Sequence, residues 1–421
     1  MNKIERLLHT LAPKGVEFKT LEEVFEIRNG YTPSKNNPEF WKNGTIPWFR
    51  MEDLRENGRI LKDSIQHITP KALKGKKLFP KNSIIISTTA TIGEHALLIV
   101  ESLANQRFTF LSKKANCDIA LDMKFFFYQC FLLGEWCKNN TNVSGFASVD
   151  MTAFKKYKFP IPPLEIQQEI VTILDAFTEL NTELNTELNA RKKQYQYYQN
   201  MLLDFNDINQ NHKDAKMSAK PYPKRLKTLL HTLAPKGVGF RKLGEVCDFQ
   251  KGKSITKKAV TFGKVPVISG GRQPAYYHNE ANRSGETIAI SSSGVYAGYV
   301  SYWDIPVFLA DSFSVSPKQK TLMPKYLFHY LTTQQDAIHA TKSAGGIPHV
   351  YSKDLQNFLI PIPPLEIQQE IVKILDQFLA LTTDLLAGIP AEIKARKKQY
   401  EYYREKLLAF KPLTPNKEVK A

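Results

Sequence analysis

Apolar side chains recur every three to four residues over residues 164–205, which is the period of an α-helix that buries one side. The stripe consists of Ile166, Ile170, Ile173, Leu174, Phe177, Leu180, Leu184 and Leu188. Two prolines precede the stretch and no glycine or proline interrupts it, so the pattern predicts one continuous helix about 60 Å long. A lone helix of this length needs a partner to cover its apolar side.

A second stretch, residues 364–410, has the same pattern and supplies that partner. Its seam includes Ile371, Leu375 and Phe378. The segment AGIPAEIK lies inside it, and we expect Gly388 and Pro390 to break or kink the helix, with Pro390 restarting it at its first position. The two helices are therefore expected to pack on each other.

The first helix contains TELN written three times, at residues 178–189. Each unit adds about 6 Å and turns the stripe by about 40°, so three units keep leucine on a stripe about 100° wide. Twelve residues separate Phe177 from Ala190 and 16 separate Phe378 from Ala395, a difference of one unit. We interpret TELN as a spacer that sets helix length in fixed steps; the alternative is a surface helix with accidental low complexity.

The chain repeats itself on a larger scale. PIPPLEIQQEIV occurs at residues 160–171 and 361–372, ARKKQY at 190–195 and 395–400, and LLHTLAPKGV at 7–16 and 229–238. Between these markers, residues 17–159 and 239–360 are similar only in outline. They combine β-branched and aromatic runs, glycine and serine turns, and helical stretches such as 121–136.

These patterns predict an α+β protein with an internal twofold repeat. The expected parts are two globular domains at residues 1–163 and 225–363, the long helices at 164–205 and 364–410, a polar linker at 206–224 and a tail at 411–421. The basic and aromatic helix ends, ARKKQYQYY and ARKKQYEYY, could bind phosphate and stack on bases, but helix packing and partner contact are favoured.

The net charge of the chain is +17. Such an excess favours a polyanionic partner, with nucleic acid ahead of an anionic membrane surface and of a merely lysine-rich proteome. There is no run of apolar residues long enough to span a membrane and no signal-peptide pattern, so a cytoplasmic protein is expected. Cys117, Cys130, Cys137 and Cys247 form no paired motif and are expected to be reduced, with no zinc site.

The repeated motifs, the twofold plan and the tandem phrase resemble the specificity subunit of a type I restriction-modification system, over essentially the whole chain. The resemblance implies two target-recognition domains that each read one half of a split DNA site, and antiparallel helices that set the distance between them. It implies two methyltransferase subunits and the restriction/translocase subunits as partners. It also implies a circular layout in which the chain ends meet.

The chain contains two partial matches to the motifs of nucleotide-binding and methyltransferase enzymes. KGKS at residues 251–254 lacks the phosphate-loop glycine, since Cys247 stands in its place. NNPEFW at 36–41 lacks the second proline of an adenine-methyltransferase tetrapeptide, and HExxH and GxSxG do not occur. We therefore expect no enzyme activity, cofactor or metal; methyl transfer and base flipping would belong to a partner with its own AdoMet.

Base reading requires Arg, Lys, Asn or Gln at base edges, with phosphate contacts around them. The candidates in the first domain are Trp48, Arg50, Asn105, Gln106 and Arg107. Those in the second domain are Arg272, Gln273, Tyr276 and Tyr277, which we expect on a glycine-loosened loop, and Ser292 and His349. Gln106 and Arg107 could equally lie in a strand and support the fold. The lysine-rich segments at 69–81 and 250–258 are candidates for phosphate contact.

Three other functions stay open at this point. One is the specificity subunit of a fused enzyme that both cuts and methylates. Another is a coiled-coil scaffold whose domains bind proteins and whose charge is incidental. A nuclease is the least favoured, because no cluster of metal-binding carboxylates can be named.

Overall fold

The structure is a computed structural model that describes residues 3–142, 147–205, 221–318, 320–343, 346–384 and 387–413. The chain forms two compact units, the first made of residues 1–182 and 394–421 and the second of residues 183–393. The 40-residue helix α6, Leu164–Leu203, contributes residues to both. The predicted linker at 206–224 lies mostly outside the described residues, and α8 begins at Lys224.

The first unit is built on two small sheets. One has the strand order β2-β9-β6-β7-β4 and the other β5-β3-β8, while β1-β12 and β10-β11 form two-stranded ladders. The strands are β1 Glu17–Thr20, β2 Phe25–Asn29, β3 Ile46–Phe49, β4 Ile60–Leu61, β5 His67–Ile68, β6 Ser83–Ser87, β7 His95–Leu98, β8 Leu103–Ala104, β9 Phe108–Lys113, β10 Thr141–Asn142, β11 Ser148–Val149 and β12 Lys158–Ile161. The central strand β6 is buried along its whole length, which explains its three consecutive isoleucines between two serines.

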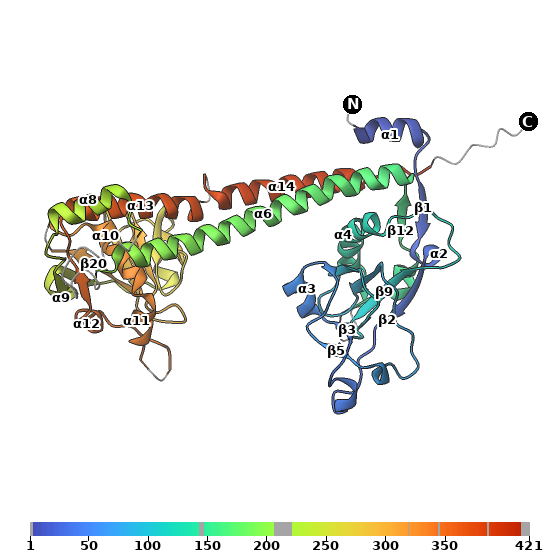
Figure 1. Cartoon of the computed structure of the whole chain (residues 1–421), viewed down its shortest axis with the longest axis horizontal. Helices are drawn as coiled ribbons and strands as arrows, with labels where there is room; N and C mark the ends of the chain where they lie inside the picture. The colour runs from blue at the N-terminus through green and yellow to red at the C-terminus, as the bar shows by residue number, and fades with distance from the viewer. Residues whose placement is uncertain are drawn as a thin grey trace, which may run out of the picture. The chain divides into compact units, whose positions relative to one another are not determined.

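One helix connects this sheet to the long helix. The helix α4, Met123–Asn139, begins where Asp122 accepts hydrogen bonds from two backbone N–H groups, and it packs between the sheet and α6 (Figure 1). It lies within three residues of the helix predicted at 121–136. The other helices of this unit are α1 Lys3–Leu11, α2 Leu21–Val24, α3 Met51–Asn57 and α5 Met151–Lys155, with 3-10 turns η1 Pro38–Phe40 and η2 Pro70–Leu73.

The second unit repeats this plan with a four-stranded sheet in place of the five-stranded one. Its sheets have the orders β14-β20-β17-β18 and β16-β15-β19, and β13 pairs with β21. The strands are β13 Phe240–Lys242, β14 Cys247–Lys251, β15 Val265–Ile268, β16 Tyr276–His278, β17 Thr287–Ser291, β18 Val300–Trp303, β19 Phe308–Leu309, β20 Ser312–Pro317 and β21 Leu359–Pro361. The helices are α8 Lys224–Leu233, α9 Leu243–Val246, η3 Lys257–Ala259, α10 Pro324–Thr333, α11 Gln335–Ala340, α12 Ser352–Leu355, α13 Leu365–Thr383 and α14 Ile389–Leu408.

A glycine directly follows the corresponding strands β2 and β14 and makes the same hydrogen bond in both units. Gly30 donates its N–H to the carbonyl of Phe108, and Gly252 donates its N–H to the carbonyl of Ser312, at 2.9 and 2.8 Å. A Cβ at Gly30 would lie 2.2 Å from the Asn105 carbonyl oxygen, so only glycine fits there. Gly252, the glycine of KGKS, is therefore a strand-end residue like Gly30, and the predicted internal repeat is confirmed at the level of single hydrogen bonds.

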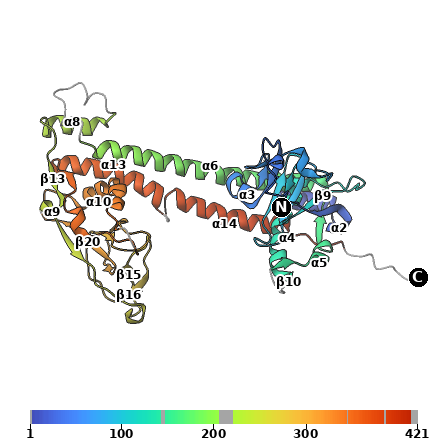
Figure 2. The same ribbon diagram turned by 90° about the horizontal axis from the view of Figure 1, so that it is seen from below.

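The long helices run antiparallel within each unit. In the first unit Phe177, near the start of α6, stacks on Tyr403, near the end of α14, with 5.5 Å between ring centroids. In the second unit Phe378 of α13 stacks in the same way on Tyr198, near the end of α6, at 5.1 Å. Figure 2 shows the expected break between α13 and α14, with Pro390 as the second residue of α14 rather than the first.

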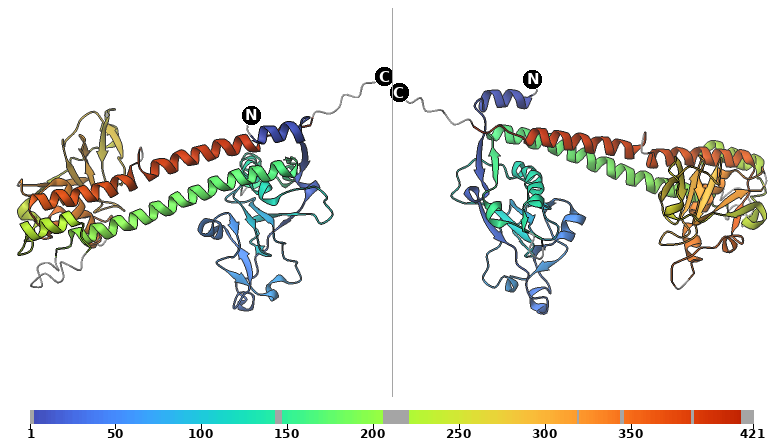
Figure 3. Two further views of the ribbon diagram at one scale, coloured as in Figure 1. Left: turned by 45° about the horizontal axis from the view of Figure 1, so that its top comes forward. Right: turned by 180° about the vertical axis from the view of Figure 1, so that it is seen from behind.

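The beginning and the end of the described chain meet in the first unit. The N–H of Val16 donates to the carbonyl of Lys411 at 2.9 Å, and the N–H of Leu413 donates to the carbonyl of Val16 at 3.0 Å. Both views in Figure 3 show α1 beside the end of α14. This is the closure that the resemblance implied.

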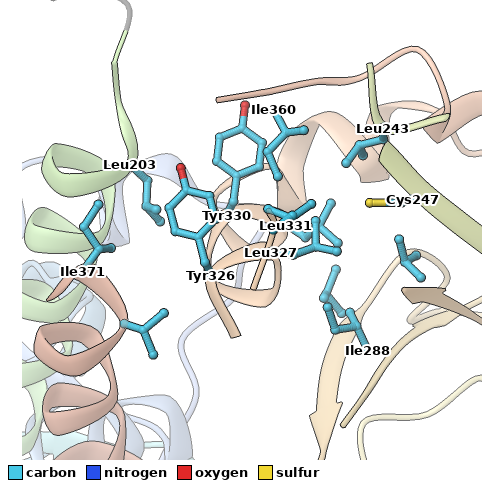
Figure 4. Packing of buried hydrophobic residues seen from close by; sticks show 14 of the residues in the cluster. Leu203, Leu243, Cys247, Ile288, Tyr326, Leu327, Tyr330, Leu331, Ile360 and Ile371 are labelled. Atoms are coloured by element: carbon cyan, nitrogen blue, oxygen red, sulfur yellow. The ribbon is translucent and has the colours of Figure 1, made fainter. Parts of the chain in front are cut away.

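The core of the second unit lies on both sides of α10. Figure 4 shows its side chains between residues of the long helices and residues of the sheet. Two tyrosines of α10 are fixed by their hydroxyl groups, since Tyr326 donates to the Pro361 carbonyl at 3.1 Å and Tyr330 to the Leu359 carbonyl at 2.7 Å. Burial, which disfavours the phenolate, raises the pKa of Tyr326. The four cysteines are free, and three of them are buried.

Candidate nucleic-acid interface

Five of the predicted base-reading residues of the first unit meet at one pocket of about 370 Å³. They come from two places in the chain, the end of β3 and the turn between β8 and β9. The five are Trp48, Arg50, Asn105, Gln106 and Arg107. Spacing along the sequence could not show this meeting, because parallel pairing of β3 with β8 is what brings the two segments together.

The pocket is rich in cations. Its lining includes Lys35, Arg50, Arg55 and Arg107, against the single carboxylate of Glu52. Glu52 lies 3.9 Å from the Nε of Arg50, whose side chain also lies over the Trp48 ring at 5.9 Å. A concave, cationic site of this kind suits the phosphates and acceptor-bearing base edges of nucleic acid.

Trp48 forms a wall of the pocket. Its side chain is only 3% exposed, and its indole N–H donates to the carbonyl of Tyr31 at 2.9 Å. The ring also packs edge-on against Trp41 at 5.0 Å. Because the ring is almost completely buried, Trp48 supports the wall of the pocket, and its contact with a base stays a prediction.

The turn after β8 presents hydrogen-bond donors. The Oδ1 of Asn105 accepts the backbone N–H of Arg107 at 3.0 Å, which fixes the Asn105 amide with its NH₂ group free to donate elsewhere. Gln106 accepts from the hydroxyl of Thr32. Gln106 and Arg107 are exposed and lie in this turn, not in a strand.

Two candidates of the second unit, Ser292 and His349, lie close together where strands end. The N–H of Val350, the residue after His349, donates to the carbonyl of Ser292 at 2.9 Å, and Ser293 forms a bridge with His349. Gly270, at the start of the loop that carries Arg272, lies against Ser293, since a Cβ there would be 2.6 Å from its carbonyl oxygen. These loops correspond to the pocket-forming loops of the first unit.

The remaining candidates of the second unit lie on its surface. The Arg272 guanidinium lies over the rings of Tyr296 and Tyr299, at 4.9 and 5.6 Å, and Gln273 is exposed beside it. The exposed residues Tyr276 and Tyr277 begin strand β16 and pair with β15. We had placed them on a glycine-loosened loop; that placement is wrong, because the loop ends before Tyr276.

The lysine-rich segments are exposed in both units. Exposed lysines in the first segment are Lys71, Lys74, Lys76, Lys77 and Lys81, and in the second Lys251, Lys253, Lys257 and Lys258. The Nζ of Lys76 lies 4.0 Å from the centroid of the Tyr31 ring. Their role in phosphate contact stays a prediction.

A glutamine of the repeated motif fixes each globular domain to its long helix. Gln167 of α6 accepts the N–H of Asp122 at 2.8 Å and donates to the carbonyls of Ala120 and Pro162 at 2.9 and 2.7 Å. Gln368 of α13 makes the same three bonds, with Met323, Thr321 and Pro363, at 2.9, 2.8 and 2.7 Å. Both glutamines are 0% exposed. We call each set of three bonds the glutamine clasp.

An aspartate of the same motif adds a second connection. Asp175 binds Lys124 and Tyr128 of α4, both at 2.6 Å, and Asp376 binds Lys325 and His329 of α10 at 2.7 and 2.8 Å. Burial alone would raise the pKa of Asp376, but the hydrogen bonds and charges of His329 and Lys325 outweigh it and lower that pKa.

The helix ends are used for packing. The hydroxyl of Tyr195 lies 3.2 Å from Nδ1 of His329, Gln199 donates to the His329 carbonyl at 3.0 Å, and Leu202 is 1% exposed. Along the seam Ile170, Leu174, Leu184, Ile371 and Leu375 are buried, and Phe177, Leu180, Leu188 and Phe378 are half-buried. The threonines and glutamates of the TELN units are exposed.

Gln167, Asp175, Gln368 and Asp376 are not among the residues that the sequence predicted for a role. The available signal was that polar residues were identical in both copies of PIPPLEIQQEIV and its ILD extension. A polar residue repeated inside an otherwise apolar helix face is a candidate for a buried hydrogen bond.

The chain was compared with proteins of known family and structure. A family model described as the type I restriction modification DNA specificity domain matches residues 13–194 and 235–395. The chain is 41% identical over 400 residues to the type I restriction enzyme EcoprrI specificity subunit of Escherichia coli, which covers 91% of this chain and 93% of that protein.

Two solved structures have a similar fold. One is the crystal structure of a type I restriction-modification system S subunit from M. genitalium, with a TM-score of 0.56, 18% identity and coverage of 94% and 96% of the two chains. The other, from work on complex assembly and conformational transition of the type I R-M system, has a TM-score of 0.58, 20% identity and coverage of 94% and 97%.

Proposed function

The chain belongs to the family of type I restriction-modification DNA specificity domains, and from this membership we propose that it is the DNA-reading subunit of such a complex. Its two base-reading domains each recognise one half of a bipartite site in double-stranded DNA. The observation that carries the proposal is the difference between the two units: the glutamine clasps are the same, whereas the loops at the strand ends carry different polar side chains.

The partners follow from this role. Two methyltransferase subunits supply AdoMet chemistry and base flipping, and restriction/translocase subunits supply cleavage, while this chain supplies recognition. Such a complex acts on cellular DNA, so we place it in the cytoplasm. Within the described residues no helix has the length and apolarity needed to cross a membrane.

The long helices set the length of the unread DNA between the half-sites. The three TELN units lie inside α6, with Leu184 buried and Leu180 and Leu188 half-buried, so each unit contributes one leucine to the seam. Removing one unit shortens the helix by about 6 Å, which is between one and two base-pair rises of about 3.4 Å.

Modified-base sequencing tests the assignment. DNA from cells with and without this gene is compared, and a bipartite methylated motif must disappear with the gene. Deleting residues 182–185, one TELN unit, should then change the spacer length of the motif and leave both half-sites intact. An altered half-site with an unaltered spacer would contradict the spacer role.

Purification of the native complex separates the two restriction-enzyme assignments. A separate large helicase subunit that copurifies with the chain supports the type I assignment. A single partner that both cuts and methylates would instead indicate a fused enzyme. A complex whose DNA retention does not fall with rising salt would support the protein-scaffold alternative.

A further inference from the structure

One position in the base-reading loops carries opposite charges in the two units. We propose that Arg107 reads a guanine in one half-site and that Asp311 reads a base with an exocyclic amino group, cytosine or adenine, in the other. The inference rests on the proposed function and names the bases that two residues of the site select.

Backbone hydrogen bonds show that the two residues are equivalent. The carbonyl of Arg107 accepts the N–H of Thr88 at 3.1 Å, and the carbonyl of Asp311 accepts the N–H of Ser292 at 3.0 Å. Thr88 directly follows β6 and Ser292 directly follows β17, the matching central strands. Each residue also directly precedes the next strand, β9 or β20.

The loops that carry Arg107 and Asp311 differ in length between the preceding strand and this position. Three residues, 105–107, connect β8 to β9, and two residues, 310–311, connect β19 to β20. The equivalence therefore could not be found by counting along the chain. The ladder bonds show it because they fix the backbone on both sides of the loop.

The Arg107 side chain is free to bind a ligand. It is exposed, and in the described part of the chain its guanidinium makes no hydrogen bond or ion pair with the protein. The neighbouring Asn105 presents its NH₂ group as a donor, while its oxygen already accepts the Arg107 backbone N–H. The pocket is therefore rich in donors, with several cationic side chains against the one carboxylate of Glu52, whereas adenine would require an acceptor for its N6 group.

Guanine matches this arrangement best. Its major-groove edge carries two acceptors, O6 and N7, and a bidentate arginine is the commonest specific contact to that edge. Lys35 and Arg55, which line the same pocket, are placed to neutralise backbone phosphates around it.

Asp311 presents the opposite chemistry. One of its carboxylate oxygens accepts from the hydroxyl of Ser293, and its other oxygen has no protein partner in the described residues. The side chain is exposed. A carboxylate is repelled by phosphate, so on a DNA-facing loop its favourable contact is with a base amino group, N4 of cytosine or N6 of adenine.

The test uses the assembled complex in cells, with modified-base sequencing as the readout. Arg107→Ala should relax one guanine position of one half-site, with about 10- to 100-fold less discrimination there, and leave the other half-site unchanged. Asp311→Ala should relax one cytosine or adenine position of the other half-site. Lys35→Ala is the matched pocket control and should reduce methylation at all sites without changing the motif.

A second measurement does not depend on the folding of a variant. The wild-type complex is titrated with oligonucleotides in which each guanine of the half-site is replaced in turn by 7-deazaguanine, which lacks the N7 acceptor. One replacement should weaken binding about tenfold or more. The same replacement should have little effect on the Arg107→Ala complex.

The outcomes separate this inference from the proposed function. If the methylated motif persists without the gene, the proposed function fails. If the motif requires the gene but both alanine variants preserve both half-sites, or no guanine replacement weakens binding, this inference alone is overturned. A variant that loses all methylation leaves the oligonucleotide titration of the wild-type complex to decide.

Discussion

The glutamine clasp can be tested with a control that the chain itself supplies. The motif contains two adjacent glutamines, of which Gln167 is 0% exposed and Gln168 is exposed. Gln167→Leu keeps a similar side-chain volume but removes three hydrogen bonds, whereas Gln168→Leu removes none that the structure shows for its side chain. We predict that only the first change destabilises the protein.

The expected magnitude follows from the three bonds. Each contributes about 1 kcal/mol net, so their loss costs about 3 kcal/mol. The bond to the Pro162 carbonyl is buried. Its loss leaves a buried oxygen without a partner, so it costs more stability than the loss of an exposed bond. For a unit of about 200 residues, 3 kcal/mol corresponds to a fall in Tm of about 6–12 °C.

Thermal unfolding of the full-length chain, followed by circular dichroism and by fluorescence, measures the effect. The Gln167→Leu transition should fall by that amount while Gln168→Leu stays within about 2 °C of the parent, as surface substitutions do. Gln368→Leu and Gln369→Leu form a second pair with the same expectation, since Gln368 is buried and Gln369 exposed. Equal melting of the two members of a pair would refute the role of the clasp.

Two further predictions concern the sheet and the aspartate of the same motif. Gly30→Ala should destabilise by about 1–3 kcal/mol, because the new Cβ would meet a carbonyl oxygen at 2.2 Å, whereas Gly239→Ala, with no atom within 4 Å, should change stability by under about 0.5 kcal/mol. Asp376 has a lowered pKa in the folded state, so its ionised form contributes stability at neutral pH that is lost as the pH falls below about 4. Asp376→Asn should therefore differ most from the parent near pH 7, and the difference in urea midpoint should shrink in acid; a gap that widens in acid would contradict the sign.

Local periodicity was enough to predict the long helices and the repeat. A helix over 164–205 required only the spacing of its apolar residues and the absence of breakers, and the structure has α6 at Leu164–Leu203. The break near Gly388 followed from proline chemistry. These features depend on residues close together in sequence, which is why sequence alone reached them.

Features that depend on how helices pack and strands pair could not be predicted from the sequence. Nothing in the letters QQ shows which glutamine is buried, because that depends on where α4 packs against α6. Tyr276 and Tyr277 look like loop residues beside Gly270 and Gly271, yet pairing with β15 places them in a strand. The sequence also does not show that Trp48 is buried, because its burial depends on how β3 packs in the core.

Asp311 was missed for a related reason. A single aspartate in LADSF follows no periodic pattern. Its equivalence to Arg107 is visible only when the backbone hydrogen bonds of the two residues are compared. Our candidate for this region, Ser292, is in fact the residue whose N–H makes that bond. Ser292 therefore lies beside Asp311, and its own contact with DNA stays a prediction.

The roles proposed for the equivalent residues Arg107 and Asp311 would let recognition change without a change of fold. The backbone bond at this position is 3.1 Å in one unit and 3.0 Å in the other, although the side chains carry opposite charges. The loop is fixed by main-chain groups, and the domain is fixed to its helix by glutamine bonds to main-chain carbonyls, so neither depends on the side chain that faces the DNA. A substitution at this position therefore alters which hydrogen-bonding group a base must offer while leaving the folding free energy nearly unchanged. Two copies of one plan can in this way read unlike half-sites.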